Sequence, residues 1–240
     1  MSERPDIETS SPEYARRFSG QAGRYFLTIQ EQAVSRLLSG RSGFSVLDVG
    51  GGHGQLVPLF MRLGCSLTSY GSDETTHEGV RARYPDSGIH FASGSVLDLP
   101  YAGRTFDVVV AIRLISHIQE WERLIDELCR VARFSVLIDY PSWYSLNALT
   151  PLLFAVKKRV EGNTRTYTSY TDRSIAEAFG RSGFRVMSVQ KQLFLPMVLH
   201  RALHGASWLQ STEWAVERVG LTSILGSPVL VRADRVADSA

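Results

Sequence analysis

Cysteine is scarce in this sequence of 240 residues. Only Cys65 and Cys129 occur, and neither belongs to a C-x-x-C pair. A disulfide framework needs several cysteines, and a thiolate zinc site needs closely spaced ones. Both kinds of site are therefore excluded, and we interpret the two thiols as small core residues of a protein from a reducing compartment.

An excess of charge of either sign is also missing. The sequence has 26 Lys and Arg against 24 Asp and Glu, a formal charge of +2. Binding to nucleic acid by phosphate neutralisation needs a strongly basic surface, so we expect no nucleic-acid partner. Between residues 141 and 170 basic residues outnumber acidic ones. This local excess leaves two interpretations open, a solvated helix face or contact with an anionic acceptor or a membrane surface.

Long apolar runs are absent as well. The longest, at 146–156 and 193–199, each contain a proline and are shorter than the about 20 residues of a membrane-spanning helix. The first twelve residues are polar and acidic, whereas a secretory signal is basic and then apolar. We therefore expect a cytoplasmic protein without a spanning helix.

Strand and helix patterns alternate along the chain. Such alternation predicts a parallel sheet with right-handed crossovers and an α/β fold. Two helices, interrupted near Gly20 and Gly23, are expected within 14–38, ahead of the sheet. The expected strands are 44–49, 66–70, 89–92, 106–112, 134–139, 184–189 and 228–232, and the expected helices are 55–62, 75–83, 120–132, 171–179 and a stretch within 197–219.

A glycine-rich turn follows the first expected strand. Residues 46–54 read VLDVGGGHG and lie at a switch from strand to helix, where open α/β sheets bind ligands. A dinucleotide fingerprint, G-x-G-x-x-G, would need its third glycine at position 55, which is Gln55. NAD is therefore disfavoured, although a nucleotide-dependent oxidoreductase stays an alternative.

Asp48 followed by glycines at 50, 52 and 54 resembles the first motif of the class I S-adenosylmethionine-dependent methyltransferases. The similarity continues at 98–101 (DLPY) with 105–109 (TFDVV), and at 113–118 (RLISHI). The resemblance implies a Rossmann-like, doubly wound, mostly parallel seven-stranded sheet of order 3-2-1-4-5-7-6, with an antiparallel last strand and a helical cap. We expect one methyltransferase domain over 1–240, divided into an N-terminal helical cap (1–40), a cofactor-binding core (41–140), a substrate cap insertion (141–170) and the C-terminal part of the sheet with a helical insertion (171–232).

The resemblance also implies S-adenosylmethionine as cofactor. Asp48 would hydrogen-bond through the loop or attract the cofactor's ammonium, and the glycines would allow close approach of the backbone. The sequence departs from the family twice, because Gly71 stands where an acid usually binds the ribose, leaving Asp73 as the nearest one, and Ser95 replaces the acid near the adenine. The candidate cofactor-binding residues are Asp48, Gly50, Gly51, Gly52, Gly54, Ser72, Asp73, Ser95, Val96, Ile112, Arg113, Arg24 and Tyr25.

His117 and Tyr140 are the candidate catalytic residues. His117 follows the fourth strand and is either a general base or a histidine that caps a loop. Tyr140 follows the fifth strand, where it would form the pocket wall or take part in catalysis. His200 and His204 are one helical turn apart, like metal ligands, but no third ligand accompanies them, so we expect no metal.

These residues predict methyl transfer from S-adenosylmethionine to a small apolar or aromatic acceptor, at oxygen or carbon. Residues 111–114 (AIRL) stand where nucleic-acid aminomethyltransferases have an Asp/Asn-Pro-Pro-aromatic motif, which disfavours that activity. A non-catalytic cofactor-binding protein is the alternative, and the sequence does not indicate an oligomeric state. The expected acceptor pocket is lined by Trp143, Tyr144, Leu146, Leu152, Phe154, Phe194 and Met197, with Lys157, Lys158 and Arg159 at its mouth.

Overall fold

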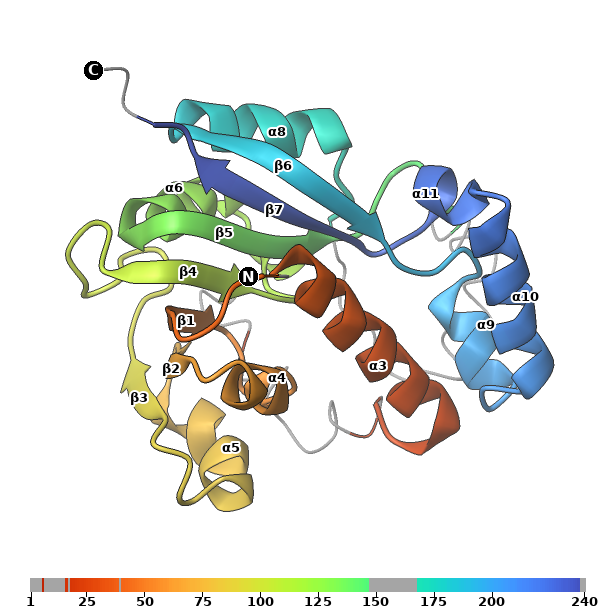
Figure 1. The fold of residues 1–240 in the computed structure, drawn as a ribbon, viewed down its shortest axis with the longest axis horizontal. Coiled ribbons are helices and arrows are strands. Elements are labelled where there is room, and N and C mark those ends of the chain that lie inside the picture. The colour runs from red at the N-terminus through yellow and green to blue at the C-terminus, as the bar shows by residue number, and fades with distance from the viewer. Residues whose placement is uncertain (1–5, 7–15, 17, 39, 147–167, 238–240) are drawn as a thin grey trace.

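A single sheet organises the protein. The computed structural model describes all residues except 1–5, 7–15, 17, 39, 147–167 and 238–240. The described residues form seven strands in the order β3-β2-β1-β4-β5-β7-β6 (Figure 1), which confirms the expected order. Strands β1 to β5 are parallel to one another, and β7 is antiparallel to both β5 and β6. The strands are β1 Ser45–Val49, β2 Ser66–Gly71, β3 His90–Ser93, β4 Phe106–Ala111, β5 Ala132–Tyr140, β6 Phe184–Lys191 and β7 Val229–Arg235.

Helices cover both faces of the sheet, as the doubly wound fold requires. One face packs on α6 and α8, and the other packs on α3, α4 and α5 (Figure 1). The helices are α3 Gly20–Leu37, α4 Val57–Arg62, α5 Glu78–Arg83, α6 Trp121–Val131, α8 Asp172–Arg181, α9 Met197–Ala202, α10 Ser207–Arg218 and α11 Leu221–Leu225, with short 3₁₀ helices η1 Glu74–His77 and η2 Ile115–His117.

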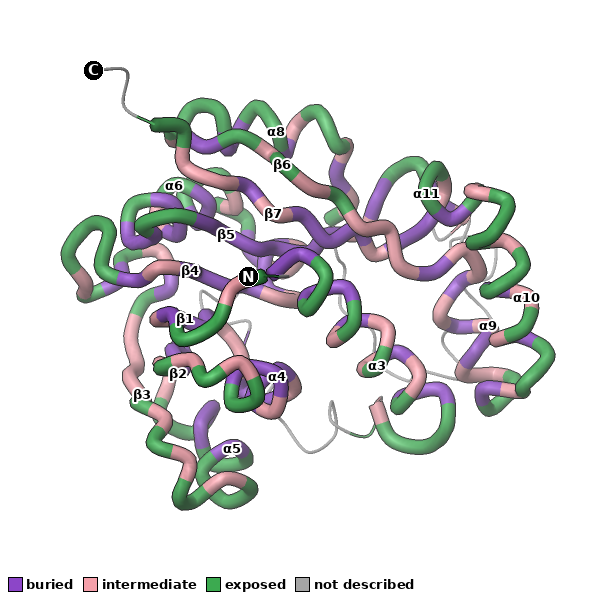
Figure 2. Tube along the Cα trace, in the orientation of Figure 1, coloured by how far each residue is buried: buried purple, intermediate pink, exposed green. Residues whose placement is uncertain are grey.

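Alternating side chains of the central strands build two separate cores. Leu47 and Val109 point to the layer of α6 and α8, whereas Val46 and Val108 point to the layer of α3 and α4. Successive side chains of a strand face opposite sides of the sheet, so a strand covered on both faces is apolar throughout. Figure 2 accordingly shows the middle of the sheet buried, and the edge strands β3 and β6 are more exposed.

The start of α3 differs from the expectation. The helix begins at Gly20, whose φ of +70° suits a glycine, so the predicted interruption there is confirmed. The predicted interruption at Gly23 is wrong, because this residue lies inside α3. A Cβ at Gly23 would stand 2.1 Å from the backbone carbon of Phe18. The glycine therefore makes room for the chain that enters the helix.

The helical stretch after β6 is divided by a tight turn. His204 and Gly205 both have positive φ and separate α9 from α10. A Cβ at Gly205 would lie 2.7 Å from the backbone nitrogen of Ala22, so this turn packs directly on α3. No helix in the described part of the chain is long and apolar enough to cross a membrane.

Candidate cofactor site

The glycine loop lies at the point where the sheet changes direction. β1 has β2 on one side and β4 on the other, so a crevice forms beyond the carboxyl end of β1. The Gly50 amide donates to the Tyr70 carbonyl at 2.8 Å, and the Gly54 amide donates to the Gly51 carbonyl at 2.7 Å. Gly50 and Gly54 have φ of +75° and +61°, a conformation that glycine adopts without steric cost. The glycines are therefore needed for the tight turn itself.

Asp48 forms the floor of this loop. It lies within β1 and is only 4% exposed. A Cβ at Gly51 would stand 2.0 Å from Asp48 Oδ2, so the loop backbone lies directly against the carboxyl group. Burial raises the pKa of Asp48 to about 7, because a charged carboxylate is poorly solvated there. A cationic ligand would favour the ionised form.

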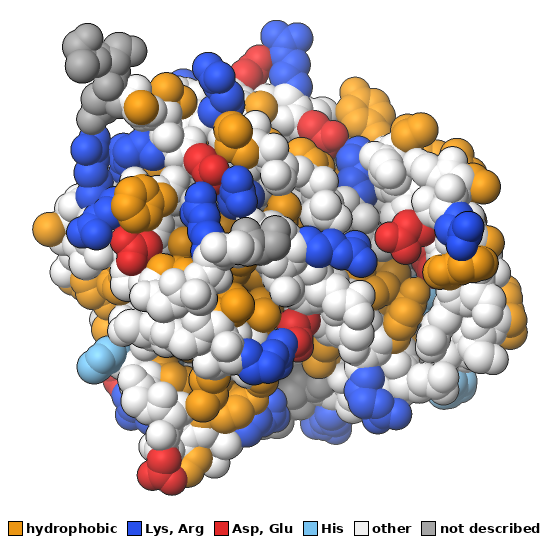
Figure 3. Space-filling model, in the orientation of Figure 1, with side chains coloured by type: hydrophobic (Ala, Val, Ile, Leu, Met, Phe, Trp, Pro, Cys, Tyr) orange, Lys and Arg blue, Asp and Glu red, His pale blue; other side chains and the backbone are white. Residues whose placement is uncertain are grey.

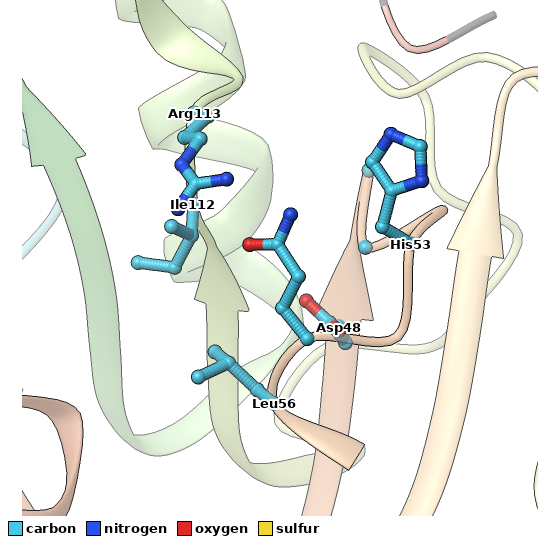
Figure 4. A pocket seen from close by; sticks show the side chains of 8 residues that line it. Asp48, His53, Leu56, Ile112 and Arg113 are labelled. Atoms are coloured by element: carbon cyan, nitrogen blue, oxygen red, sulfur yellow. The ribbon is translucent and has the colours of Figure 1, made fainter. Parts of the chain in front are cut away.

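A small hollow of about 30 Å³ opens beside the loop. Figure 4 shows Asp48 between His53 on one side and Ile112 and Arg113 on the other. The structure thus brings together five residues expected to bind the cofactor, because the end of β4 lies next to the end of β1. The hollow is lined by Asp48, Gly50, Gly51, His53, Gln55, Leu56, Ile112 and Arg113.

Arg113 joins several elements at this site. Its backbone has a φ of +60°, and its amide donates to Asp139 Oδ1 at 2.5 Å. Its guanidinium donates to Gln30 Oε1 of α3 at 2.6 Å and stacks over the Phe18 ring at 3.9 Å. These contacts hold the N-terminal helix against the carboxyl ends of β4 and β5.

Sequence reasoning missed Asp139, a second buried acid at this edge. It is 4% exposed and is the second-last residue of β5. Burial raises the pKa of Asp139 to about 6, although the amide and charge of Arg113 lower it. The available signal was an acid closing an otherwise apolar strand. Two buried carboxyl groups at strand ends favour a ligand with positive charge.

The end of β2 has a carboxylate from an unexpected part of the chain. A Cβ at Gly71 would stand 2.0 Å from Thr76 Oγ1, so an acidic side chain does not fit there. Asp6 instead accepts a hydrogen bond from the Ser72 amide at 2.6 Å, and it is fully buried. Ser72 Oγ is also buried, with no hydrogen-bond partner among the described residues. Asp6 was missed because nothing in its local sequence indicates this contact.

Three other predicted residues lie at the same edge of the sheet. Asp73 caps η1, because its Oδ1 accepts from the Thr75 amide at 3.1 Å and from the Thr75 hydroxyl at 2.9 Å. Ser95 is exposed, and its Oγ accepts from the Leu97 amide at 3.2 Å. Val96 is buried in the core. Asp73 therefore follows the end of β2, and Ser95 and Val96 follow the end of β3.

The two candidate catalytic residues differ in their surroundings. The ring of Tyr140 belongs to the core, and its hydroxyl donates to Oδ1 of the exposed Asp172 at 2.9 Å. Burial, and then the charge of Asp172, raise the pKa of Tyr140, which makes the phenol a poor proton donor or base. His117 is half-buried and ends η2, just beyond β4. His117 is not among the residues that line the hollow beside the glycine loop.

Other predicted residues lie elsewhere. Arg24 is exposed, and Tyr25 packs against His200, with ring centroids 5.7 Å apart, beside a different cavity. The structure does not bring these two residues to the glycine loop. Trp143 and Tyr144 are 60% and 64% exposed. Leu152, Phe154, Lys157, Lys158 and Arg159 lie outside the described residues.

The described residues fit S-adenosylmethionine. This molecule has a sulfonium and an ammonium against one carboxylate, so it is a net cation, and Asp48 and Asp139 supply buried acids at the strand ends. Gly51 leaves no room for a side chain between the loop and Asp48. The unpartnered Ser72 hydroxyl is suited to a ribose hydroxyl, because it both donates and accepts.

Comparison with known proteins agrees with this fit. Residues 47–135 match a family model described as a methyltransferase domain. A probable S-adenosylmethionine-dependent methyltransferase from Mycobacterium tuberculosis is 28% identical over 114 residues, which are 48% of this chain and 41% of that protein. The chain thus matches less than half the length of this relative.

Solved structures share the fold at low identity. Magnesium protoporphyrin IX methyltransferase from Synechocystis, solved with bound SAH, has a TM-score of 0.64 at 14% identity, over 93% of each chain. The [4+2]-cyclase SpnF has a TM-score of 0.61 at 16% identity, over 87% of this chain and 80% of its own. Residues 47–135 thus match a methyltransferase domain, and the chain shares its fold with a solved methyltransferase.

Proposed function

We propose that the protein transfers a methyl group from S-adenosylmethionine to a small apolar or aromatic acceptor, at oxygen or carbon. The observation that carries this proposal is the buried Asp48 under the glycine loop, next to Ile112 and Arg113 at the switch point of the sheet. A fold that also occurs in a cyclase does not by itself establish methyl transfer. The proposal therefore rests on the site and on the matched domain.

Bound S-adenosylmethionine would supply an electrophilic methyl group with the sulfur as leaving group, and a base would take the proton of the acceptor. The chain's contribution is alignment of the two reactants, which is a large part of catalysis in bimolecular reactions. Asp48 and Asp139 hold positive charge at the carboxyl ends of β1 and β5. Water has little access to either acid, because both are 4% exposed.

His117 is the proposed base for an acceptor that must lose a proton. It is half-buried at the end of η2 and follows β4, the strand next to Asp48. A histidine base is active only when neutral, so the rate should rise with pH through the pKa of the imidazole. His117→Gln should lower kcat and remove this dependence. A histidine that only packs would leave the pH profile unchanged.

Two carboxylates are candidates for the ribose hydroxyls. Asp73 is the residue expected from the sequence, and its Oδ1 accepts hydrogen bonds from Thr75. Asp6 accepts a hydrogen bond from the Ser72 amide. Loss of a charge-assisted hydrogen bond costs about 1.5–3 kcal/mol. We propose that Asp73→Asn weakens cofactor binding by this amount, with the exposed Glu74→Gln as control. If Asp6→Asn alone weakens binding, the register that assigns Asp73 is wrong.

The proposed acceptor pocket involves residues 141–170. Its described part includes Trp143 and Tyr144, which follow β5 and expose more than half of their surface. Large exposed aromatic side chains beside a ligand site favour an apolar or aromatic acceptor. Replacement of both residues by serine should abolish transfer while sparing cofactor affinity.

Two measurements test the proposed function in order. Isothermal titration calorimetry with S-adenosylmethionine, on the parent protein and on Asp48→Asn, measures binding at the glycine loop. Transfer of a radiolabelled methyl group to extracted small molecules then measures catalysis. Asp107→Asn is the matched control. Asp107 belongs to the neighbouring β4, but its carboxylate accepts a hydrogen bond from the Ser45 amide at 3.0 Å and does not line the hollow beside the glycine loop. Absence of binding refutes the proposal, and binding without transfer leaves the non-catalytic alternative.

A further inference from the structure

A second cavity lies apart from the glycine loop. It has a volume of about 240 Å³ and lies between α3, the carboxyl end of β6 and the helices α10 and α11. Figure 1 shows α3 and α10 on either side of the end of β6. The volume is slightly below the about 300–1,000 Å³ of pockets for drug-sized ligands. A ligand of one ring is therefore the appropriate size.

The charged groups around the cavity are already paired, beginning with those near its surface. Arg36 and Glu217 lie 4.0 Å apart and are both well exposed, and charged side chains of both signs occur on the surface between α3 and α10 (Figure 3). The Lys191 ammonium lies 3.2 Å from Asp172 and donates to the Ile224 carbonyl at 3.0 Å. Both cations thus already lie near an anionic side chain of the protein.

Glu213 is paired in the same way at the inner wall. Its carboxylate accepts from the amides of Phe194 and Leu195, at 2.9 and 3.0 Å. It also lies 2.9 Å from Nε2 of the buried His200. The four charged side chains that line the cavity sum to zero, two cations and two anions. The cavity is therefore suited to a neutral ligand.

Neutral polar groups make up much of the remaining wall. Four glutamine amides line the cavity, and each carries two donors and an acceptor. Nε2 of Gln192 is buried without a hydrogen-bond partner in the described part of the chain. The same is true of Thr222 Oγ1, in a residue that is only 5% exposed. A buried polar atom without a partner destabilises the fold, so a ligand that satisfies both atoms gains free energy on binding.

Aromatic surfaces complete the cavity. Tyr25 lines it from α3 and Trp214 from α10. Burial, and then the charges of Glu213 and Glu217, raise the pKa of Tyr25 to about 12, so its phenol stays neutral and can donate a hydrogen bond. Aromatic faces pack against the C–H groups of a saturated ring, and the Tyr O–H and Trp N–H groups form hydrogen bonds with its hydroxyl groups.

We propose that this cavity binds a neutral ring that carries several hydroxyl groups, such as a monosaccharide or a cyclitol. One ligand hydroxyl can donate to Thr222 Oγ1 while it accepts from Gln192 Nε2, because a hydroxyl does both. The remaining hydroxyls bond the other amides, and Tyr25 and Trp214 contact the ring. The site differs from the cofactor site in every lining residue. The inference is therefore independent of the proposed methyl transfer.

The test uses four probes of this chemistry: methyl β-D-glucopyranoside, methyl β-D-galactopyranoside, methyl α-D-mannopyranoside and myo-inositol. Saturation-transfer difference NMR on the full chain measures their binding at millimolar concentration. At least one probe should bind, and glucuronate, which adds a carboxylate, should bind at least tenfold more weakly. Failure of all four, or preference for glucuronate, overturns the proposal.

Two variants locate the binding. Thr222→Val and Gln192→Leu keep the side-chain size and remove the unpartnered atoms, so each should weaken probe binding at least tenfold. Thr222→Val should not lower the thermal unfolding temperature, because Thr222 Oγ1 has no hydrogen-bond partner among the described residues. Trp208→Ala is the control, since Trp208 belongs to α10 but is exposed away from the cavity lining. Undiminished binding in both variants would refute the assigned site.

Discussion

Substitution of Asp48 by asparagine should make the protein more stable at neutral pH. Its carboxyl group is buried against the glycine loop, and its pKa rises from 3.8 to about 7. Each tenfold change in proton affinity is worth about 1.4 kcal/mol, so the raised pKa corresponds to about 4 kcal/mol. Between pH 4 and 7 the folded state holds a proton that the unfolded state has lost. Stability therefore falls as pH rises through this window.

The gain in unfolding free energy from Asp48→Asn should accordingly depend on pH. Asparagine has nearly the same shape and does not ionise, so the variant lacks the cost of about 4 kcal/mol that the parent bears above pH 7. At pH 5 the parent bears about 3 kcal/mol less of this cost, because folded Asp48 is still protonated. Urea unfolding of both proteins at pH 5 and pH 8 measures the difference. A gain that is equal at both values, or a loss at pH 8, would refute the reasoning.

Asp107→Asn should behave in the opposite way. Hydrogen bonds from the Ser45 amide and hydroxyl, with the charge of Arg133, lower the pKa of Asp107. Its ionised form therefore stabilises the folded state above the unfolded pKa, and this contribution is lost in acid. The variant should be less stable than the parent at pH 8. The comparison separates the effect of burial from a general effect of removing negative charge.

Two further predictions concern the loop and the core. Gly51→Ala should destabilise the protein by about 1–3 kcal/mol and weaken S-adenosylmethionine binding in calorimetry, because its Cβ would overlap Asp48. Gly180→Ala in α8, where a Cβ meets open space, should be neutral or stabilising by up to about 1 kcal/mol. An equal loss of unfolding free energy in both variants would contradict this reasoning. Tyr140→Phe should cost about 0.5–1.5 kcal/mol in urea unfolding through the lost bond to Asp172, whereas a large fall in kcat at unchanged cofactor affinity would show that Tyr140 is catalytic.

The strands were predictable because their signal is local. Residues 106–112 form a continuous apolar run after Asp107, which is typical of a strand covered on both faces. The structure places β4 there, at the middle of the sheet. The break at Gly205 and the continuity of α3 through Gly23 depend instead on which backbone lies opposite each glycine. Such tertiary contacts leave no pattern in the surrounding sequence.

The site was predictable to the extent that it is contiguous in the chain. Asp48, Gly50 and Gly51 belong to one motif, and the order of strands brings Arg113 beside them. Asp139 reaches Arg113 across 26 residues of sequence through the pairing of β4 with β5. Asp6, near the N-terminus, reaches the end of β2 across 66 residues of sequence. Neither contact follows from spacing, because each requires the three-dimensional path of the chain.

Helix α3 contacts both proposed ligand sites. On one side Gln30 holds Arg113 at the glycine loop, and on the other Tyr25, Ile29 and Ala33 line the second cavity. If occupancy of one site moves this helix, thermodynamic linkage requires that each ligand alter the affinity of the other by the same factor. Gln30→Ala, which removes the bond to Arg113, would then reduce the coupling in both directions equally. The helix would then transmit the same coupling free energy from either site to the other.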